Sequence, residues 1–475
     1  MAAQAVLRAT ALVETLSCAG AEIRGTHGFA ALQSPHMSEA GAILPTSPSF
    51  VAGVRERLDY LLRAGLVVGN QGLNSAANLA ISLYLIRMLG VAEFGIYAVY
   101  FATAFGISAV VNALIASPLV SIASQKAASV RAAMIVSASV AITAISLALL
   151  LLALGLDLVL WLVAGSAHKT LLAVAFGTSM AASEFLRRAC FLSGRADKVW
   201  RFDLLRYGLL LVVFTLLAWF NAEATTAQYV LLMTVSNGLA VAVLALPDLT
   251  GHASSWSYKR ARVHIAHFAR SGRWLSLSSM LQFAGDHALL LIAAFMVGPF
   301  AAGTIRICQA IVGVVNPILS ALEHMLPKKL GEDIRQHGSE HALVAHRRVS
   351  MLIMLAMASI LSIVALFAPF ILDKVSGEEL HGYEMLLRLY CALWLLYPIV
   401  QMLSFIFRAR GRTVPVLVSQ SIAAGLALAT SIPLIGQFGA YGVVWGTIIA
   451  QIAAIVTLVL MSERKSPLLL RENGR

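Results

Sequence analysis

The sequence has few charged residues. Asp, Glu, Lys and Arg together make up 12% of its 475 residues, against about 25% in ordinary soluble domains. Hydrophobic residues make up 59%, and the mean hydropathy is +0.82. This composition excludes a water-soluble globular domain and indicates an integral membrane protein.

Cysteines and metal-binding patterns are also sparse. The four cysteines are scattered, with no CxxC pair: Cys18, Cys190, Cys308 and Cys391. We interpret them as small apolar residues and predict neither a disulfide nor a metal site. His337 and His341 stand at helical spacing in HGSEH, but no further convincing metal ligand accompanies them.

The sequence contains none of the common catalytic or nucleotide-binding motifs. There is no GxxxxGK[ST] loop, no HExxH, no DxD pair, and no Ser, His and Asp set in a plausible loop. We therefore predict no catalytic residue, no cofactor and no direct drive by ATP. Transport is the class of function that remains.

Long apolar stretches are what the sequence does have. Each is about 20 residues or longer, enough to cross a hydrocarbon core of roughly 30 Å as a helix. They lie at 64–88, 96–120, 132–155, 170–192, 204–220, 227–247, 274–297, 302–326, 350–372, 386–408, 413–433 and 440–461. The predicted fold class is an all-α polytopic membrane protein with about twelve transmembrane helices.

The basic residues predict the orientation in the membrane. Lys and Arg accumulate on the cytoplasmic side of membrane proteins. With both termini placed in the cytoplasm, Arg87, Lys169 and Lys374 lie outside and Arg306 and Arg388 lie within helices, and the rest of the 35 basic residues are cytoplasmic. This distribution accounts for the net charge of +12 without a nucleic-acid partner.

An internal repeat divides the chain. Gly90 and Gly95 flank the turn after the first predicted helix, and Gly298 and Gly303 flank the turn after the seventh, at an offset of 208. We predict two pseudo-symmetric six-helix halves with the same orientation, related by an axis along the membrane normal.

The predicted segments follow from this division. The first is a disordered cytoplasmic tail, unless the true start is Met37 and residues 1–36 are not native. The linker between the halves mixes Trp256 and Phe268 with basic residues, which suits an amphipathic helix on the inner leaflet. The segments are the tail 1–55, the N-terminal half 56–247, the cytoplasmic linker 248–273, the C-terminal half 274–463 and the cytoplasmic C-terminal tail 464–475.

The first helix of each half carries a polar stripe. Asn70, Asn74 and Asn78 recur every four residues, so they share one helix face. The offset of 208 leads to three further polar residues: Ser278, Gln282 and Asp286. A charge near the bilayer centre costs about 2.5 to 3.5 kcal/mol, so such groups normally face the bundle interior. We predict that the two stripes line a central substrate cavity; the alternative is that the amides only join helices.

Asp286, His287 and Arg306 form the strongest predicted group. Asp286 with its neighbour His287 is the candidate for ion coupling. Arg306 in the eighth helix is the nearest candidate counter-charge, and we also predict that it lines the substrate cavity and contacts a substrate diphosphate. A structural ion pair between Asp286 and Arg306 is the competing interpretation.

Four further arginines are candidates for contact with a substrate phosphate. Arg87 and Arg388 lie near external helix ends, where reaching to lipid headgroups is the alternative role. Arg187 and Arg188 lie in EFLRRACF near the cytoplasmic end of the fourth helix, where Glu184 and Arg188 alternatively pair at i and i+4.

Three stretches resemble one family. QGLNSAANLAISLYLIRMLGVAEFGIYAVYFATAFGISAVVNALIASPLVS, EFLRRACFLSGR and GDHALLLIAAFMVGPFAAGTIRICQAIVGVVNPILSALEHMLP are similar to the Wzx-like polysaccharide transporters of the multidrug/oligosaccharidyl-lipid/polysaccharide (MOP) superfamily. The resemblance implies a MATE-like fold in the bacterial inner membrane. It also implies flipping of an undecaprenyl-diphosphate-linked oligosaccharide for exopolysaccharide, capsule or O-antigen synthesis, beside a polysaccharide polymerase and export machinery.

Three other functions stay open. The more distant relatives suggest a multidrug/cation antiporter or a lipid II flippase resembling MurJ. The third alternative is a non-transporting subunit that scaffolds a polysaccharide assembly complex.

Overall fold

The computed structural model describes a helical chain. The described residues are 48–124, 126–164, 169–220, 224–252, 257–319, 339–409 and 414–463; for some of these, Ser278 and Asp286 included, only the backbone is described. The chain divides into two units, Met1–Arg57 and Leu58–Arg475, and the contacts below belong to the second. Within the described residues every element is a helix, so the all-α prediction is confirmed.

The described part of the chain is a succession of helices. They are α2 (Pro48–Leu114), α3 (Ala116–Ala123), α4 (Ala128–Ala164), α5 (Thr170–Leu192), α6 (Ala196–Trp219), α7 (Thr226–His252), α8 (Tyr258–Asp286), α9 (Ala288–Met296), α10 (Pro299–Val312), η2 (Gly313–Val315), α12 (Ser339–Leu366), α13 (Ala368–Ser376), η3 (Gly377–Leu380), α14 (Glu384–Ala409), α15 (Val414–Phe438) and α16 (Ala440–Glu463).

The predicted spans coincide with these helices. Ten described segments are long and apolar enough to cross a membrane. One of them, Gly69–Ala123, holds two predicted spans, because Gly90 (φ 74°, ψ 169°) interrupts α2. The predicted span 170–192 is α5, which is not among the ten. The described residues of all twelve predicted spans therefore fall on helices or helix ends, and residues 320–326 of the eighth span and residue 413 of the eleventh lie outside the described part.

Some predicted spans are interrupted within their length. The second, 96–120, breaks at Ile115 between α2 and α3, and the eighth, 302–326, passes through the 3-10 turn η2. The seventh, 274–297, changes direction at His287 between α8 and α9. The ninth, 350–372, breaks at Phe367, just before the proline in the first turn of α13. Hydropathy alone does not report such breaks, since the residues on both sides are equally apolar.

The ends of the predicted segments differ in detail from the helices. α2 begins at Pro48, so its first turns lie in the predicted tail 1–55, whose residues 1–47 are outside the described part. α8 begins at Tyr258 and runs without a break from the predicted linker 248–273 into the seventh span. The placement of this linker on the inner leaflet stays a prediction.

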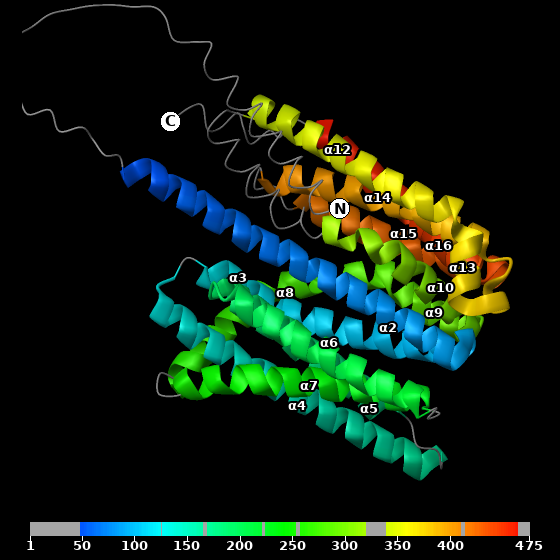
Figure 1. Cartoon of the computed structure of the whole chain (residues 1–475), viewed down its shortest axis with the longest axis horizontal. Helices are drawn as coiled ribbons and strands as arrows, with labels where there is room; N and C mark the ends of the chain where they lie inside the picture. The colour runs from blue at the N-terminus through cyan, green and yellow to red at the C-terminus, as the bar shows by residue number, and fades with distance from the viewer. Residues whose placement is uncertain are drawn as a thin grey trace, which may run out of the picture. The chain divides into compact units, whose positions relative to one another are not determined.

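The helices gather in two groups (Figure 1). α4, α5, α6 and α7 pack on one another, and α12, α14, α15 and α16 form the second group. α8 contacts both groups, because it packs on α4 and on α15. Large apolar side chains point outward, Phe295 with 92% of its surface exposed, as lipid-facing residues do.

The two halves meet closely where the predicted glycine repeat lies. A Cβ atom on Gly95 would lie 1.7 Å from the carbonyl oxygen of Pro299, and one on Gly303 would lie 2.2 Å from that of Val91. Only glycine permits this approach of α2 and α10. We call the end of the bundle that carries these glycines and the turn at Gly90 the Gly90 end.

Candidate functional site

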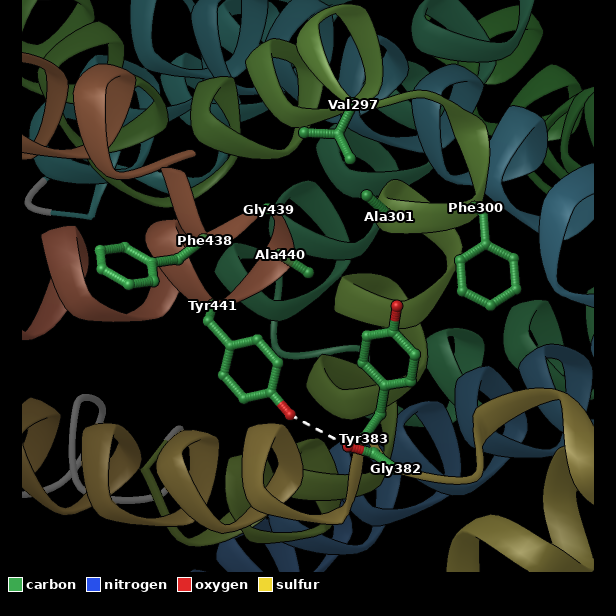
Figure 2. A pocket seen from close by; sticks show the side chains of 9 residues that line it. All are labelled: Val297, Phe300, Ala301, Gly382, Tyr383, Phe438, Gly439, Ala440 and Tyr441. Carbon is green, nitrogen blue, oxygen red and sulfur yellow. Dashed lines mark hydrogen bonds between the residues drawn. The ribbon is translucent and has the colours of Figure 1, made fainter. Parts of the chain in front are cut away.

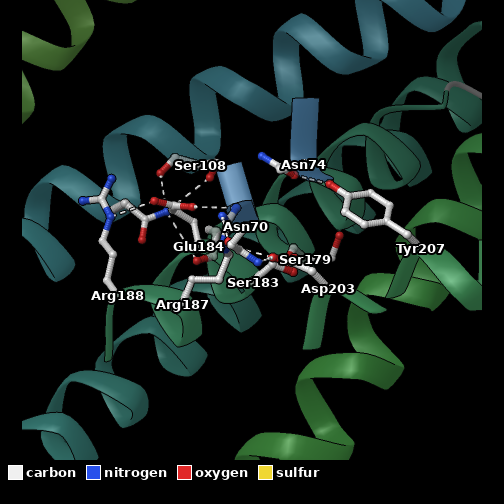
Figure 3. Close-up of polar contacts among 12 residues, drawn as sticks. Asn70, Asn74, Ser108, Ser179, Ser183, Glu184, Arg187, Arg188, Asp203 and Tyr207 are labelled. Atoms are coloured by element: carbon white, nitrogen blue, oxygen red, sulfur yellow. Dashed lines mark hydrogen bonds and ion pairs between the residues drawn. The ribbon is translucent and has the colours of Figure 1, made fainter. Parts of the chain in front are cut away.

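The amide stripe of α2 contacts a different partner at each step. Asn70, Asn74 and Asn78 lie one turn apart, and their side chains contact α5 and α6, α6, and α10 in that order. Figure 3 shows the contacts of the first two amides. The stripe thus leads from the N-terminal half to the C-terminal half.

Asn70 is the centre of a buried network. Its Nδ2 donates to Oδ2 of Asp203 at 2.7 Å, and Nη2 of Arg187 donates to its Oδ1 at 2.8 Å. Nε of Arg187 lies 3.7 Å from Oδ2 of Asp203. Asn70 and Asp203 are 0% exposed, so the amide bridges an ion pair that lies away from water. The predicted role of Asn70 in lining a substrate cavity stays a prediction. In this structure its side chain is enclosed by Arg187 and Asp203.

The arginines at the end of α5 are already paired. Nε of Arg188 lies 2.9 Å from Oε1 of Glu184, as the i, i+4 alternative predicted, and its Nη1 donates to Oγ of Ser117 at 2.9 Å. Arg187 lies 3.9 Å from Glu184. Their contact with a substrate phosphate stays a prediction.

The second amide connects to α6. The hydroxyl of Tyr207 donates to Oδ1 of Asn74, and the guanidinium of Arg206 lies 4.6 Å from the centre of the Tyr207 ring. Buried atoms without a hydrogen-bond partner remain here, namely Nε of Arg187, Nε of Arg206 and Oδ1 of Asp203.

We call this group the N-half polar cluster: Asn70, Asn74, Glu184, Arg187, Arg188, Asp203, Arg206 and Tyr207. Its three guanidinium groups exceed its two carboxylates by one positive charge.

Arg306 holds the third amide. Its Nη2 lies 3.4 Å from Oδ1 of Asn78, and its guanidinium carbon lies 3.9 Å from the centre of the Phe101 ring. Arg306 is 6% exposed, and its Nε has no hydrogen-bond partner. Among the described side chains, no carboxylate lies within ion-pair distance of it. The guanidinium is therefore oriented by neutral groups while its charge is left uncompensated by them.

The second predicted stripe is only partly described. The side chains of Ser278 and Asp286 lie outside the described residues, so their roles and the pairing of Asp286 with Arg306 stay predictions. Gln282 is exposed. The ring of His287 packs 4.3 Å from the centre of the Phe105 ring, which places it at the contact between α8 and α2.

Arg87 and Arg388 lie at the Gly90 end and not beside the stripe. Nη2 of Arg87 donates to the carbonyl of Lys374 at 2.6 Å, and Nε of Arg388 donates to the carbonyl of Ala365 at 3.2 Å. Both carbonyls are in last turns of helices, where arginine commonly satisfies free acceptors. Contact with phosphate stays a prediction for both.

A carboxylate that sequence analysis missed joins the halves. The backbone N–H of Val91 donates to Oε2 of Glu379 at 2.8 Å. Glu379 belongs to η3, whereas Val91 begins the second part of α2. With the close approach of Gly95 and Gly303, this contact closes the Gly90 end in the present structure.

The interior charges of α6 were also missed. Arg206 was assigned to the cytoplasmic basic residues, yet it lies within the apolar span Ala196–Trp219. Asp203, Arg206 and Tyr207 stand at i, i+3 and i+4, one face of a helix. This spacing in an apolar segment was the available signal.

The sequence predicts no metal site, and the two histidines of HGSEH were its weak exception. The described residues contain no group of three His, Cys, Asp or Glu side chains that could hold an ion. His337 lies outside the described residues, as does the side chain of His341.

Known structures share this fold. A MATE-family multidrug resistance transporter of the MOP superfamily, in an inward-facing conformation, matches with a TM-score of 0.63 and 17% identity over 85% of this chain and 96% of that one. The lipid II flippase MurJ, in an inward closed conformation, matches with a TM-score of 0.65 and 13% identity over 86% and 88%.

A third similar structure is a MOP superfamily transporter from Pyrococcus furiosus, described by a reverse polarity of its binding pocket that suggests a different function. It has a TM-score of 0.55 and 15% identity over 84% and 95%. No protein-family model and no curated protein matches the sequence. The chain therefore has the fold of MOP superfamily transporters, and its similar structures are transporters and flippases.

Proposed function

We propose that this chain flips an undecaprenyl-diphosphate-linked oligosaccharide from the cytoplasmic to the outer leaflet of the bacterial inner membrane. The product would serve exopolysaccharide, capsule or O-antigen assembly. Two findings support a flippase or transporter, namely the fold shared with MurJ and MATE proteins and the polar interior of an otherwise apolar bundle. The observation that carries the substrate class is the environment of Arg306.

Arg306 is suited to hold a diphosphate. Asn78 and Phe101 fix the plane of its guanidinium, but neither group neutralises it. A buried charge without an opposite charge is unfavourable, and an entering anion removes that cost. Guanidinium also binds phosphate oxygens through two parallel hydrogen bonds. The diphosphate therefore supplies the charge that the described side chains do not.

The charge of the N-half polar cluster favours the same class of substrate. Its excess of one guanidinium adds to that of Arg306, so the described interior repels cations and attracts anions. A multidrug/cation antiporter would instead need a carboxylate free to bind its substrate. Asp286, whose side chain lies outside the described part, is the candidate that the sequence offers for that role, and it also stays the candidate for proton or cation coupling.

The proposed mechanism is alternating access. Glu379 and the glycine contact hold the Gly90 end closed in this structure. The distribution of Lys and Arg predicts that this end lies on the outer side of the membrane. The sugars would occupy the interior along the amide stripe while the polyprenyl tail remains in lipid. Separation of the halves at the Gly90 end would then release the sugars outside.

The test replaces Arg306 in the native host. Arg306→Ala should leave lipid-linked oligosaccharide on the inner leaflet and lower polymer yield at least tenfold. Arg306→Lys should retain part of the activity, because it keeps the charge but not the paired hydrogen bonds. The control is Arg262→Ala, which removes an exposed arginine of α8 and should leave polymer yield unchanged.

Each rival function has its own outcome in a strain that lacks the gene. Accumulation of lipid II on the inner leaflet indicates a lipid II flippase. Normal polymer with greater uptake of cationic drugs indicates an antiporter. Lost polymer with a normal leaflet distribution indicates a scaffold beside the polymerase and export machinery. Any of these three results contradicts the proposal.

A further inference from the structure

A cavity lies at the Gly90 end, apart from the amide stripe. Three turns of the C-terminal half enclose about 270 Å³ there, between α9 and α10, between η3 and α14, and between α15 and α16. Figure 2 shows its lining residues. By the predicted orientation this cavity opens on the outer side of the membrane, where a flipped oligosaccharide arrives.

Aromatic rings dominate the cavity. Four of its lining residues are Phe300, Tyr383, Phe438 and Tyr441. The rings of Tyr383 and Tyr441 have centres 6.2 Å apart and planes within 15° of parallel, and Figure 2 shows them side by side. Phe300 adds a third ring, 5.9 Å from Tyr383 and inclined by 55°. The cavity thus has two nearly parallel aromatic rings and a third ring inclined to them.

The polar groups of the cavity are neutral. The hydroxyl of Tyr441 donates to the carbonyl of Gly382 at 3.2 Å, which fixes that ring. Figure 2 shows the hydroxyl of Tyr383 directed into the cavity. No lining residue carries a charge. Hydroxyls and backbone groups beside aromatic faces are the usual composition of a site for a small neutral ligand.

We propose that this cavity binds a neutral sugar ring of the oligosaccharide after its release on the outer side; this rests on the proposed function. A pyranose ring has a face of C–H bonds, which stacks on an aromatic ring, and a rim of hydroxyls, which bind neutral oxygens. A phosphate would require a cation in the lining and a metal ion would require carboxylates. An organic cation is favoured by rings that surround it, whereas the Tyr383 and Tyr441 rings are nearly parallel.

This site would bind the sugar part of the substrate, whereas Arg306 would bind the diphosphate, so the two contacts are independent. Occupation of the cavity by a sugar of the released chain would slow its return to the interior. The rings of Tyr383 and Tyr441 both supply a surface for stacking. The Tyr383 hydroxyl in addition supplies a hydrogen bond to the sugar.

The experiment measures binding of free neutral disaccharides of glucose, galactose and mannose to the full-length purified protein in lipid nanodiscs, by saturation-transfer NMR and by titration. We expect at least one disaccharide to bind saturably to the wild type. Tyr383→Ala should weaken this binding at least tenfold, and Tyr383→Phe should weaken it two- to fivefold. The matched control is Phe295→Ala, which removes an exposed ring of α9 outside the cavity and should leave the affinity unchanged.

Three results overturn the proposal. These are no saturable binding of any disaccharide, equal binding by wild type and Tyr383→Ala, and displacement of the sugar from the wild type by tetramethylammonium at lower concentration than by another sugar. The first two would mean that the rings only anchor the helix ends at the membrane surface. Arg306→Ala should retain sugar binding, so the site and the proposed function can fail separately.

Discussion

The contact between Gly95 and Gly303 predicts how a single methyl group changes the conformation. In Gly303→Ala the added Cβ would lie 2.2 Å from the carbonyl oxygen of Val91. An ordinary contact of about 3.4 Å needs the two backbones to separate by roughly 1.2 Å there, and such overpacking costs about 1 to 3 kcal/mol. The cost applies only to the state closed at the Gly90 end.

The population of the closed state should therefore fall by a factor of about 5 to 150 relative to the open state. The assay places a cysteine at Thr304, which is 0% exposed in α10, in a chain without its other cysteines. An impermeant maleimide added to whole cells should label Thr304→Cys slowly, and the further change Gly303→Ala should accelerate labelling at least fivefold.

The control uses a glycine that has space. A Cβ on Gly425 of α15 would meet no atom within 4 Å, so Gly425→Ala should leave labelling of Thr304→Cys unchanged. Equal labelling rates with and without Gly303→Ala in folded protein would refute the reasoning that this contact closes the Gly90 end.

Three further predictions concern other contacts. Arg187→Ala should lower the free energy of unfolding in detergent by about 3 to 5 kcal/mol, because Asp203 stays buried without its cation. The double variant Arg187→Ala/Asp203→Ala should recover much of this loss. Additive losses in the double variant would contradict the pairing. Glu379→Ala should open the Gly90 end and raise maleimide labelling, whereas Glu379→Gln should have a smaller effect because it keeps an acceptor. Burial, and to a smaller extent the charge of Arg260, lower the pKa of His264 below its usual 6.5 in the folded state. The folded protein therefore binds a proton here less readily than the unfolded chain does. The resulting stability is present above pH 6.5 and is lost as the pH falls through the lowered folded-state pKa. The melting temperature of wild type should thus fall more between pH 7.5 and 5.5 than that of His264→Gln, and parallel curves would disprove the effect.

The helices were the most predictable part. In lipid every backbone N–H and C=O needs an internal partner, so an apolar run of spanning length is necessarily helical. α5 illustrates this, since the predicted span 170–192 and Thr170–Leu192 are the same residues. The Gly-x4-Gly repeat was equally informative, because Gly90 and Gly298 both have positive φ, at 74° and 113°.

Partners across the bundle were not predictable. The sequence shows that Asn70, Asn74 and Asn78 share a face, but it does not show what faces them. Asp203 lies 133 residues from Asn70, and only the packing of α6 on α2 brings the two together. Phe101 and Glu379 carry no pattern at all, since a phenylalanine in an apolar helix and a glutamate in a loop are ordinary residues there.

The repeat of 208 residues also explains a difference between the halves. Val91 begins a helix after Gly90, and its N–H receives Glu379 as acceptor. The residue at the same place in the other half is Pro299, the first residue of α10 after Gly298, and proline has no N–H to satisfy. Two identical six-helix units would present the same two donors across the predicted two-fold axis. Here the C-terminal half holds both the acceptor Glu379 and the residue without a donor, Pro299, so one carboxylate satisfies the one free N–H of the pair.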